Sequence, residues 1–263
     1  RKSQLGEVVL SAQNLCAIND KGLPALRDIS LNVRQGEILG VAGVSGNGQR
    51  ELAEVLTGLR KLTGGQVFIR NRELTNRPPL DFISSGVSHI PADRIGMGLA
   101  GNLPICDNLI MKAYRHRPLS TGPFLKNKTI IRFAKNLIDA FDILTPSQAT
   151  PARNLSGGNQ QKAILAREIT AGRETERRDG TTLLIAVQPT RGLDVGATES
   201  VRHSLLDQSK QGSAILLISE DLDELLALSN FIAVMHSGKI MGIVDAGAAD
   251  IHDIGLMMAG ELT

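Results

Sequence analysis

Short apolar runs alternate with amphipathic stretches along the second half of the chain. Residues 182–187 and 214–219 read TLLIAV and AILLIS, and both runs are almost continuously apolar. Residues 159–169 and 197–211, and a stretch that begins at Asp221, have the apolar spacing of helices. Strands that are apolar on both faces and alternate with helices predict a parallel sheet covered by helices on both sides. The last apolar segment, FIAVMHSGKIMGIV, predicts a hairpin that turns at Ser237 and Gly238.

The first half shows the two-residue alternation of strands that are exposed on one face. The segments VVLSAQNL, ALRDISLNV and GGQVFIR predict a mostly antiparallel layer. Between them, the apolar run 36–42 predicts a buried strand, followed by a glycine-rich loop. A helix is predicted over 49–59, with Leu52, Val55, Leu56 and Leu59 on one face.

Residues 96–152 have a different character from the segments on either side. Apolar positions fall at helical spacing in NLIMKAY and IIRFAKNLIDAFDIL, with Pro and Gly at the joints. We therefore predict one domain in which residues 1–95 and 153–263 form the core and 96–152 form an inserted helical subdomain. The charged stretch GRETERRDG, residues 172–180, is interpreted as a solvated loop.

Composition excludes several classes of site. The chain of 263 residues carries 29 basic and 27 acidic residues in an intermixed order, so the net charge of +2 predicts no nucleic-acid partner. Cys16 and Cys106 lie outside any CxxC pattern, which argues against a zinc site or a disulfide framework. The histidines show no metal-ligand spacing, and no metal site is predicted. No stretch approaches the roughly 18 consecutive apolar residues of a membrane-spanning helix.

The loop GVSGNGQRE keeps the frame of a phosphate-binding loop, whose pattern is GxxxxGK[ST]. Gly43 and Gly48 stand at the required positions, but Gln49 replaces the lysine and Arg50 replaces the hydroxyl residue that binds Mg²⁺. Alone, the pattern fits a tight turn without a ligand as well as it fits an anion site. The candidate nucleotide-binding residues are Gly43, Val44, Ser45, Gly46, Asn47, Gly48, Gln49 and Arg50.

A second motif, LSGGNQQKAILARE, places a Ser-Gly-Gly turn before an amphipathic helix. It resembles the signature sequence of ABC-type ATPases, LSGGQ, in the variant with an additional Asn159 that occurs in importers of sugars and nucleosides. Glycines let the backbone approach a phosphate, Ser156 can donate to it, and the helix dipole favours the anion. The resemblance assigns the signature to Leu155, Ser156, Gly157, Gly158, Asn159, Gln160 and Gln161.

A third segment, LLIAVQPTRGLDVGA, matches the place where this family has a strand ending in Asp-Glu. Val187 and Gln188 stand there instead, and Glu220 stands where the family has its switch histidine. Thus Gln188 and Glu220 mark degenerate catalytic positions, because Gln188 cannot accept the proton of an attacking water. The following loop is intact, and the resemblance assigns the domain interface to Gly192, Leu193 and Asp194. No aromatic residue precedes Phe68 to stack on an adenine ring, and Ala92 aligns with the family's lobe-linking glutamine.

The resemblance implies an α/β fold, a P-loop NTPase (RecA-like) ABC ATPase domain with an antiparallel β subdomain and an inserted helical subdomain. It is strongest to the second, C-terminal half of tandem importer ATPases for nucleosides or monosaccharides. Because the chain begins with Arg1, we expect it to be part of a longer polypeptide. In such pairs each ATP lies between the phosphate loop of one domain and the signature of the other.

The chain is therefore expected to donate its signature to the ATP site of a partner ABC domain. Its own site is expected to bind ATP weakly and to hydrolyse it poorly or not at all, and Mg²⁺ binding there stays open. Implied partners are integral-membrane permease subunits and, indirectly, a substrate-binding protein, on the cytoplasmic face of the membrane. The alternatives are a nucleotide-free structural or regulatory ABC module, a self-sufficient P-loop ATPase, and an ABC module that serves DNA repair or the ribosome.

Overall fold

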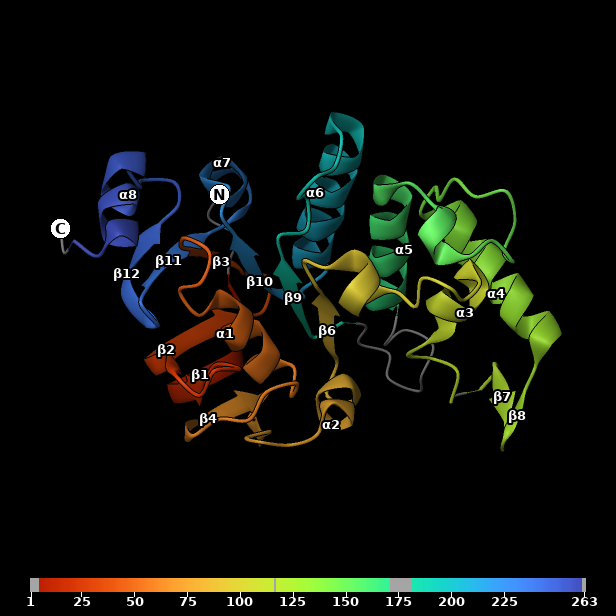
Figure 1. Ribbon diagram of the computed structural model, residues 1–263, viewed down its shortest axis with the longest axis horizontal. Coiled ribbons are helices and arrows are strands. Elements are labelled where there is room, and N and C mark those ends of the chain that lie inside the picture. Colours follow the sequence, from red (N-terminus) through yellow and green to blue (C-terminus); the bar gives the residue numbers. More distant parts are fainter. Residues whose placement is uncertain (1–4, 116, 171–180, 262–263) are drawn as a thin grey trace. The chain divides into compact units, whose positions relative to one another are not determined.

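The computed structural model describes residues 5–115, 117–170 and 181–261 (Figure 1). The predicted loop over 172–180 lies outside these residues. The chain divides into two compact units, which are described separately. The first holds Arg1–His89, Thr182–Gln188 and Leu206–Thr263, and the second holds Ile90–Thr181 and Pro189–Leu205. The predicted subdomain 96–152 falls inside the second unit, and its exact boundaries stay a prediction.

Within the described residues, the largest sheet has six strands in the order β12-β11-β3-β10-β9-β6. Its neighbours β11, β3, β10 and β9 run parallel, and β12 pairs antiparallel with β11. The predicted parallel sheet and the terminal hairpin are confirmed, whereas β6 was not predicted. The strands are β3 (Ile38–Ala42), β6 (Val87–Ile90), β9 (Leu183–Val187), β10 (Ala214–Ser219), β11 (Phe231–His236) and β12 (Lys239–Asp245).

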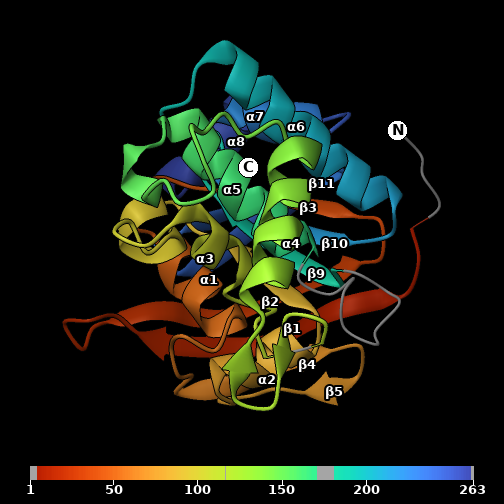
Figure 2. The same cartoon turned by 90° about the vertical axis from the view of Figure 1, so that its right-hand side faces the viewer.

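The predicted antiparallel layer is also confirmed, as the sheet β2-β1-β4-β5 of the first unit (Figure 2). Its strands are β1 (Val8–Ile18), β2 (Pro24–Arg34), β4 (Gly64–Ile69) and β5 (Arg72–Glu73). Helix α1 (Gln49–Leu56) contacts β1, β2 and β9. Apolar side chains of both sheets and α1 form one continuous core, which also includes Phe82 of α2 (Pro79–Ser84). Burial of this apolar surface fixes α1, and with it the loop that precedes the helix.

Helix α1 is shorter than the sequence predicted. Leu52, Val55 and Leu56 are buried, but Leu59 is 51% exposed, so its predicted place on the buried face was wrong. The Thr57 hydroxyl donates to the carbonyl oxygens of Ala53 and Glu54, and Gly58 then adopts a φ of 75°. This left-handed residue ends the helix and turns Leu59 away from the core.

Two further helices cover the first unit near the end of the chain. Helix α7 (Leu222–Leu228) packs against β3 and begins after Asp221, whose carboxylate accepts from the Glu224 amide at 3.2 Å. Helix α8 (Ile251–Ala259) packs against β11 and β12 (Figure 1). The sequence did not predict α8. The Asp250 carboxylate caps this helix by accepting from the His252 amide at 2.7 Å.

The second unit is mainly helical and also contains the hairpin β7–β8, which the sequence did not predict. Helix α3 contacts both α4 and α5, and a buried carboxylate of Glu168 pairs with Lys112 and Arg167. Among the described residues, no helix is long and apolar enough to cross a bilayer. The elements are η1 (Arg94–Gly98), α3 (Ile105–Ile110), β7 (Ser120–Thr121), β8 (Phe124–Leu125), α4 (Asn127–Ala140), η2 (Ala152–Asn154), α5 (Gly157–Thr170) and the first part of α6 (Val195–Lys210).

Candidate functional site

The loop between β3 and α1 has the backbone shape of a phosphate cradle. Gly46 and Gly48 have φ values of 90° and 103°, which side chains other than glycine rarely adopt. Gly48 is also the N-cap of α1, and a methyl group there would clash with the Ala25 carbonyl oxygen. Val44 is 55% exposed, so the crown of the loop faces solvent ahead of the helix N-terminus. This arrangement can receive an anion.

The Gln49 side chain closes this loop from within. It is only 8% exposed, and its Nε2 donates to the Val44 carbonyl oxygen at 3.0 Å. A methyl group on Gly43 would clash with the same Nε2 atom, so glycine at position 43 makes room for the amide. The predicted replacement of lysine by Gln49 thus leaves a neutral group that bonds to the loop itself.

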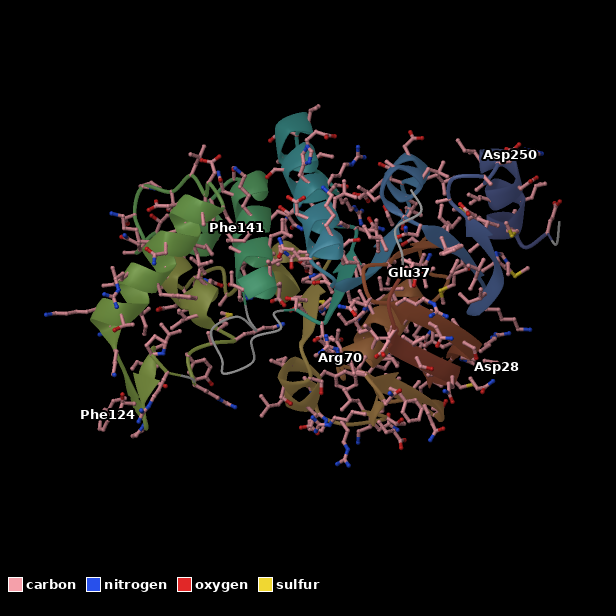
Figure 3. All side chains as sticks on the ribbon, turned by 180° about the vertical axis from the view of Figure 1, so that it is seen from behind. Asp28, Glu37, Arg70, Phe124, Phe141 and Asp250 are labelled. Atoms are coloured by element: carbon pink, nitrogen blue, oxygen red, sulfur yellow. The ribbon has the colours of Figure 1, made fainter. Side chains whose placement is uncertain are left out.

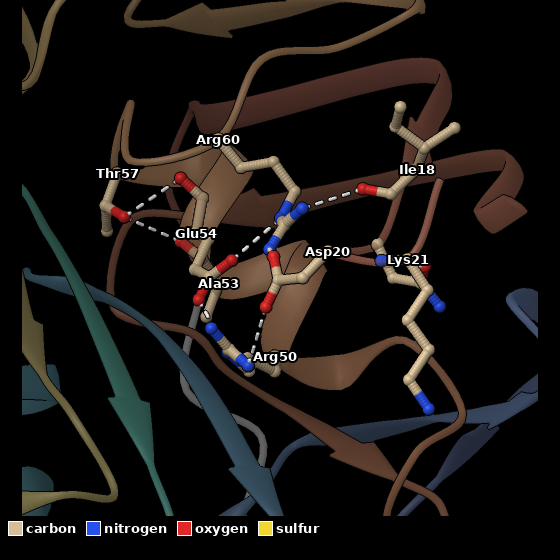
Figure 4. Close-up of polar contacts among 9 residues, drawn as sticks. Ile18, Asp20, Lys21, Arg50, Ala53, Glu54, Thr57 and Arg60 are labelled. Atoms are coloured by element: carbon tan, nitrogen blue, oxygen red, sulfur yellow. Dashed lines mark hydrogen bonds and ion pairs between the residues drawn. The ribbon is translucent and has the colours of Figure 1, made fainter. Parts of the chain in front are cut away.

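Arg50, at the position of the Mg²⁺-binding hydroxyl, is held in a ring of ion pairs (Figure 4). Its Nε donates to Glu54 Oε1 at 2.7 Å and its Nη1 lies 3.3 Å from Asp20 Oδ2. Arg60 completes the ring, with Nε 2.7 Å from Glu54 Oε2 and Nη2 2.5 Å from Asp20 Oδ1. Every oxygen of both carboxylates is therefore used, and α1 is tied to the turn after β1.

The ring also sets the proton affinities of its members. Hydrogen bonding by Arg60, and then the charges of both arginines, hold the pKa of Asp20 below its ordinary value. The hydrogen bond that Arg50 donates to Glu54 raises the pKa of Arg50, and the hydrogen bond that Arg60 donates to Asp20 raises the pKa of Arg60. With its pKa raised, Arg50 stays a cation and has no proton-transfer role.

The strands place Gln188 and Glu220, which the sequence predicted to be degenerate catalytic positions, at the carboxyl edge of the parallel sheet. Val187 pairs with Ile218 and Ala42 pairs with Ser219, so Gln188 and Glu220 leave the sheet at the edge where the phosphate loop begins. Gln188 has a φ of 46°, and its amide donates to the Ile218 carbonyl oxygen at 2.7 Å. Glu220 is exposed.

This donor set fits phosphate but does not fit Mg²⁺. The cradle offers backbone N–H groups and a helix N-terminus, which suit an anion. Magnesium needs oxygen ligands, yet Arg50 and Val187 stand at the two positions that supply them in the resembled family. Among the described residues there is no group of three His, Cys, Asp or Glu side chains that could hold a metal.

The signature residues lie together in the second unit, at the start of α5. Ser156 is exposed, and its Oγ accepts from Asn159 Nδ2 at 2.9 Å. Asn159 Oδ1 also accepts from the Leu144 amide at 2.8 Å, while Gln160 Nε2 donates to the Leu155 carbonyl oxygen at 3.0 Å. The additional Asn159 therefore fixes the Ser156 hydroxyl at the head of the helix. Gln161 is buried and faces away from solvent.

The loop over Gly192, Leu193 and Asp194 lies beside this signature, within the same unit. Asp194 caps α6 by accepting from the Ala197 amide at 2.9 Å, and a methyl group on Gly158 would meet Ala197 Cβ at 3.1 Å. Arg94, which the sequence reasoning missed, lies next to both segments. Its Nη1 donates to the Arg191 carbonyl oxygen at 2.9 Å, and its Nη2 would lie 3.8 Å from a methyl group on Gly157.

Comparison with known proteins adds independent findings. A family model described as ABC transporter matches residues 26–174. A glucose import ATP-binding protein of Haloferax volcanii is 46% identical over 97% of this chain and 45% of its own length. A guanosine import ATP-binding protein of Bacillus subtilis is 42% identical over 99% of this chain and 50% of its own length. The chain thus spans about half of the length of these relatives.

Solved structures resemble the chain in fold. The structure of an ATP-binding subunit of an ABC transporter superposes with a TM-score of 0.75 and 18% identity, over 95% of this chain and 99% of its own. An ATP-binding cassette in its ADP conformation gives a TM-score of 0.73 and 19% identity, over 96% of this chain and 95% of its own. The predicted fold class, an ABC ATPase cassette of the P-loop NTPase fold, is confirmed.

Proposed function

Since the chain belongs to the ABC transporter family, we propose that it is a nucleotide-binding domain of an importer for nucleosides or monosaccharides. In this proposal its phosphate loop binds ATP weakly without hydrolysing it. Its signature, Leu155–Gln161, completes the catalytic ATP site of a partner ABC domain in the same polypeptide. The substrate class is proposed from the relatives, which are named as glucose, guanosine and nucleoside import ATP-binding proteins.

One comparison supports the proposed difference between the phosphate loop and the signature of this chain. The Gln49 amide is buried against the Val44 carbonyl oxygen at the lysine position, while Ser156 is exposed and oriented by Asn159 at the signature. A buried neutral amide stabilises a terminal phosphate less than an ammonium does. An exposed hydroxyl at a helix N-terminus is suited to a phosphate held by another domain.

The proposed partners follow from this role. A domain that couples ATP hydrolysis to import docks on integral-membrane permease subunits at the cytoplasmic face, and acts on a substrate-binding protein only through them. The self-sufficient ATPase is disfavoured by Val187 and Gln188, which provide neither a magnesium ligand nor a general base. The nucleotide-free module differs from our proposal only in the occupancy of the phosphate loop.

Two measurements test the proposal. In the full-length importer polypeptide, Ser156→Arg crowds the phosphate-facing turn and should lower ATPase activity by about 100-fold or more. A matched Ser147→Arg variant alters an exposed serine of the same unit and should retain activity. Unchanged ATPase activity in the Ser156 variant would end the signature-donor proposal. Calorimetric titration of the 263-residue chain with ATP then decides between weak binding and the nucleotide-free module.

A further inference from the structure

One surface of the second unit is basic, although the whole chain carries a net charge of only +2. No Asp or Glu occurs between Asp107 and Asp139. Lys112 is consumed by its pair with the buried Glu168. The other described Lys and Arg side chains of this stretch are exposed, namely Arg115, Arg117, Lys126, Lys128, Arg132 and Lys135. The even distribution of charge that the composition suggested therefore does not hold locally.

Helix α4 gathers several of these cations on one face. Its buried face is formed by Ile130, Phe133, Ala134 and Leu137, which pack into the unit. On the exposed face, Lys128, Arg132 and Lys135 follow one another at spacings of three and four residues, which places them in one row. No ion pair with a described residue neutralises this row.

The β7–β8 hairpin that leads into this helix carries an apolar tip. Phe124 is 75% exposed and Leu125 is 50% exposed, and Figure 3 shows Phe124 at the outer end of the hairpin. Ile131 of α4 is also 50% exposed. Lys126 lies between the hairpin and α4, and its amide donates to the Leu119 carbonyl oxygen at 2.9 Å, which closes the hairpin. Large exposed apolar side chains flanked by cations indicate a surface that is covered by a partner.

We propose that this basic hairpin surface, formed by Phe124, Leu125, Lys126, Lys128, Arg132 and Lys135, binds the anionic headgroup layer of a lipid bilayer. The cations contact phosphate and carboxylate groups, while Phe124 and Leu125 enter the boundary between headgroups and acyl chains. The proposal goes beyond the transport role, since it assigns the chain a lipid contact of its own. It requires neither nucleotide nor partner domain.

The apolar tip favours lipid over nucleic acid. Single-stranded nucleic acids are bound by rings on which bases stack, with cations that follow the backbone. Phe124 offers a single ring at the tip, and its neighbours Leu125 and Ile131 offer none. The Tyr114 ring already lies against Arg115, whose guanidinium carbon is 5.4 Å from the ring centroid. Aliphatic and aromatic side chains beside lysines are the composition of interfacial membrane contacts.

The test is flotation of the 263-residue chain with vesicles made of equal parts of phosphatidylglycerol and phosphatidylcholine, in the absence of nucleotide. We expect binding to these vesicles and none to pure phosphatidylcholine. A triple variant, Lys126→Gln, Lys128→Gln and Arg132→Gln, should bind about 100-fold more weakly, since each cation near the membrane contributes about fivefold. The double variant Phe124→Ser and Leu125→Ser should lose about tenfold or more.

Control variants change the same number of cationic and apolar residues elsewhere. Lys61→Gln, Lys210→Gln and Lys239→Gln remove equal charge from exposed positions of the first unit, and Leu23→Ser with Leu80→Ser replaces two leucines that are 58% and 54% exposed. Both controls should bind as the unaltered chain does. Equal loss in the controls, equal binding to neutral vesicles, or preference for RNA or an acidic peptide over anionic vesicles would overturn the proposal. These outcomes leave the ATPase readout of the signature untouched, so the two proposals fail separately.

Discussion

The Nε2 atom of Gln49 donates to the carbonyl oxygen of Val44 at 3.0 Å, across the loop that would surround a phosphate. The two residues are five positions apart in the sequence, and Gln49 is only 8% exposed. A phosphate that enters the cradle competes with this internal bond and gains no charge-assisted partner from position 49. The Gln49 side chain thus bonds to the phosphate loop itself and offers no charge to a bound phosphate.

Replacement of Gln49 by Lys should strengthen nucleotide binding without creating an ATPase. A charge-assisted bond contributes about 1.5–3 kcal/mol, so ATP should bind about 10- to 100-fold more tightly in calorimetric titration. Hydrolysis should stay at background because Val187 and Gln188 are unchanged. Gln66→Lys adds the same charge on an exposed strand position and should leave ATP binding unaltered. Robust turnover by the Gln49 variant would refute the assignment of the missing carboxylates.

The sequence predicted the path of the backbone better than the arrangement of the site. The apolar runs of β3, β9 and β10 are buried almost throughout, and the first strands alternate in burial, so the parallel sheet and the antiparallel layer followed from pattern alone. Leu59 was misplaced because Gly58 turns the chain before the periodicity ends, which no apolar spacing reveals. The β7–β8 hairpin was missed because its strands have only two residues each.

The ion-pair ring is a different kind of omission. Asp20 and Arg60 are 40 residues apart, and Glu54 belongs to a helix whose other buried positions, apart from Gln49, are apolar. Pairings of this separation depend on the tertiary fold and carry no local pattern. From the sequence, Glu54, four residues after Arg50, could only have been identified as an unexpected charge among the apolar positions of α1.

Replacement of Glu54 by Gln should destabilise the fold more than any other single change in the ring. Glu54 is 8% exposed and accepts from both Arg50 and Arg60, so its loss leaves a nearly buried Arg60 guanidinium with one carboxylate fewer. We expect a loss of about 1–3 kcal/mol in the free energy of unfolding, measured by urea denaturation. The control Glu51→Gln alters a less buried carboxylate of the same helix and should cost less than about 1 kcal/mol. Equal losses of unfolding free energy in the two variants would show that the ion-pair ring is not the source of the stability.

Glu37 should make stability fall as the pH rises. Burial raises the pKa of this carboxyl above its ordinary value of 4.5, although the Arg34 amide donates to it at 2.6 Å. The folded state therefore holds a proton that the unfolded state releases, and this contribution is lost as pH increases through the raised pKa. Glu37→Gln keeps an oxygen acceptor for the Arg34 amide and removes the titration.

Urea denaturation of both proteins at about pH 4 and about pH 7 checks this linkage. The variant should gain stability relative to the unaltered chain on going to the higher pH. Glu7→Gln, a control at an exposed residue near the start of β1, should change little with pH. A constant difference between the Glu37 variant and the unaltered chain at the two pH values would show that Glu37 is not the responsible group.

Arg94 should act as a positioning residue for the proposed partner site. Its guanidinium donates to the Arg191 carbonyl oxygen and lies beside Gly157 and Gly192, so it holds the interface loop against the signature. In a polypeptide that joins this chain to the proposed partner domain, Arg94→Gln should lower kcat for ATP by about tenfold or more while the melting temperature of the protein stays within a few degrees. Arg94→Lys keeps the charge but loses the planar guanidinium, and should be about as inactive as Arg94→Gln if geometry is the cause.

The control Arg153→Gln removes an arginine of the same unit, whose Nη1 donates to Asn102 Oδ1 at 2.6 Å, and should keep kcat. Full activity in Arg94→Gln would show that the signature and the interface loop keep their places without this contact.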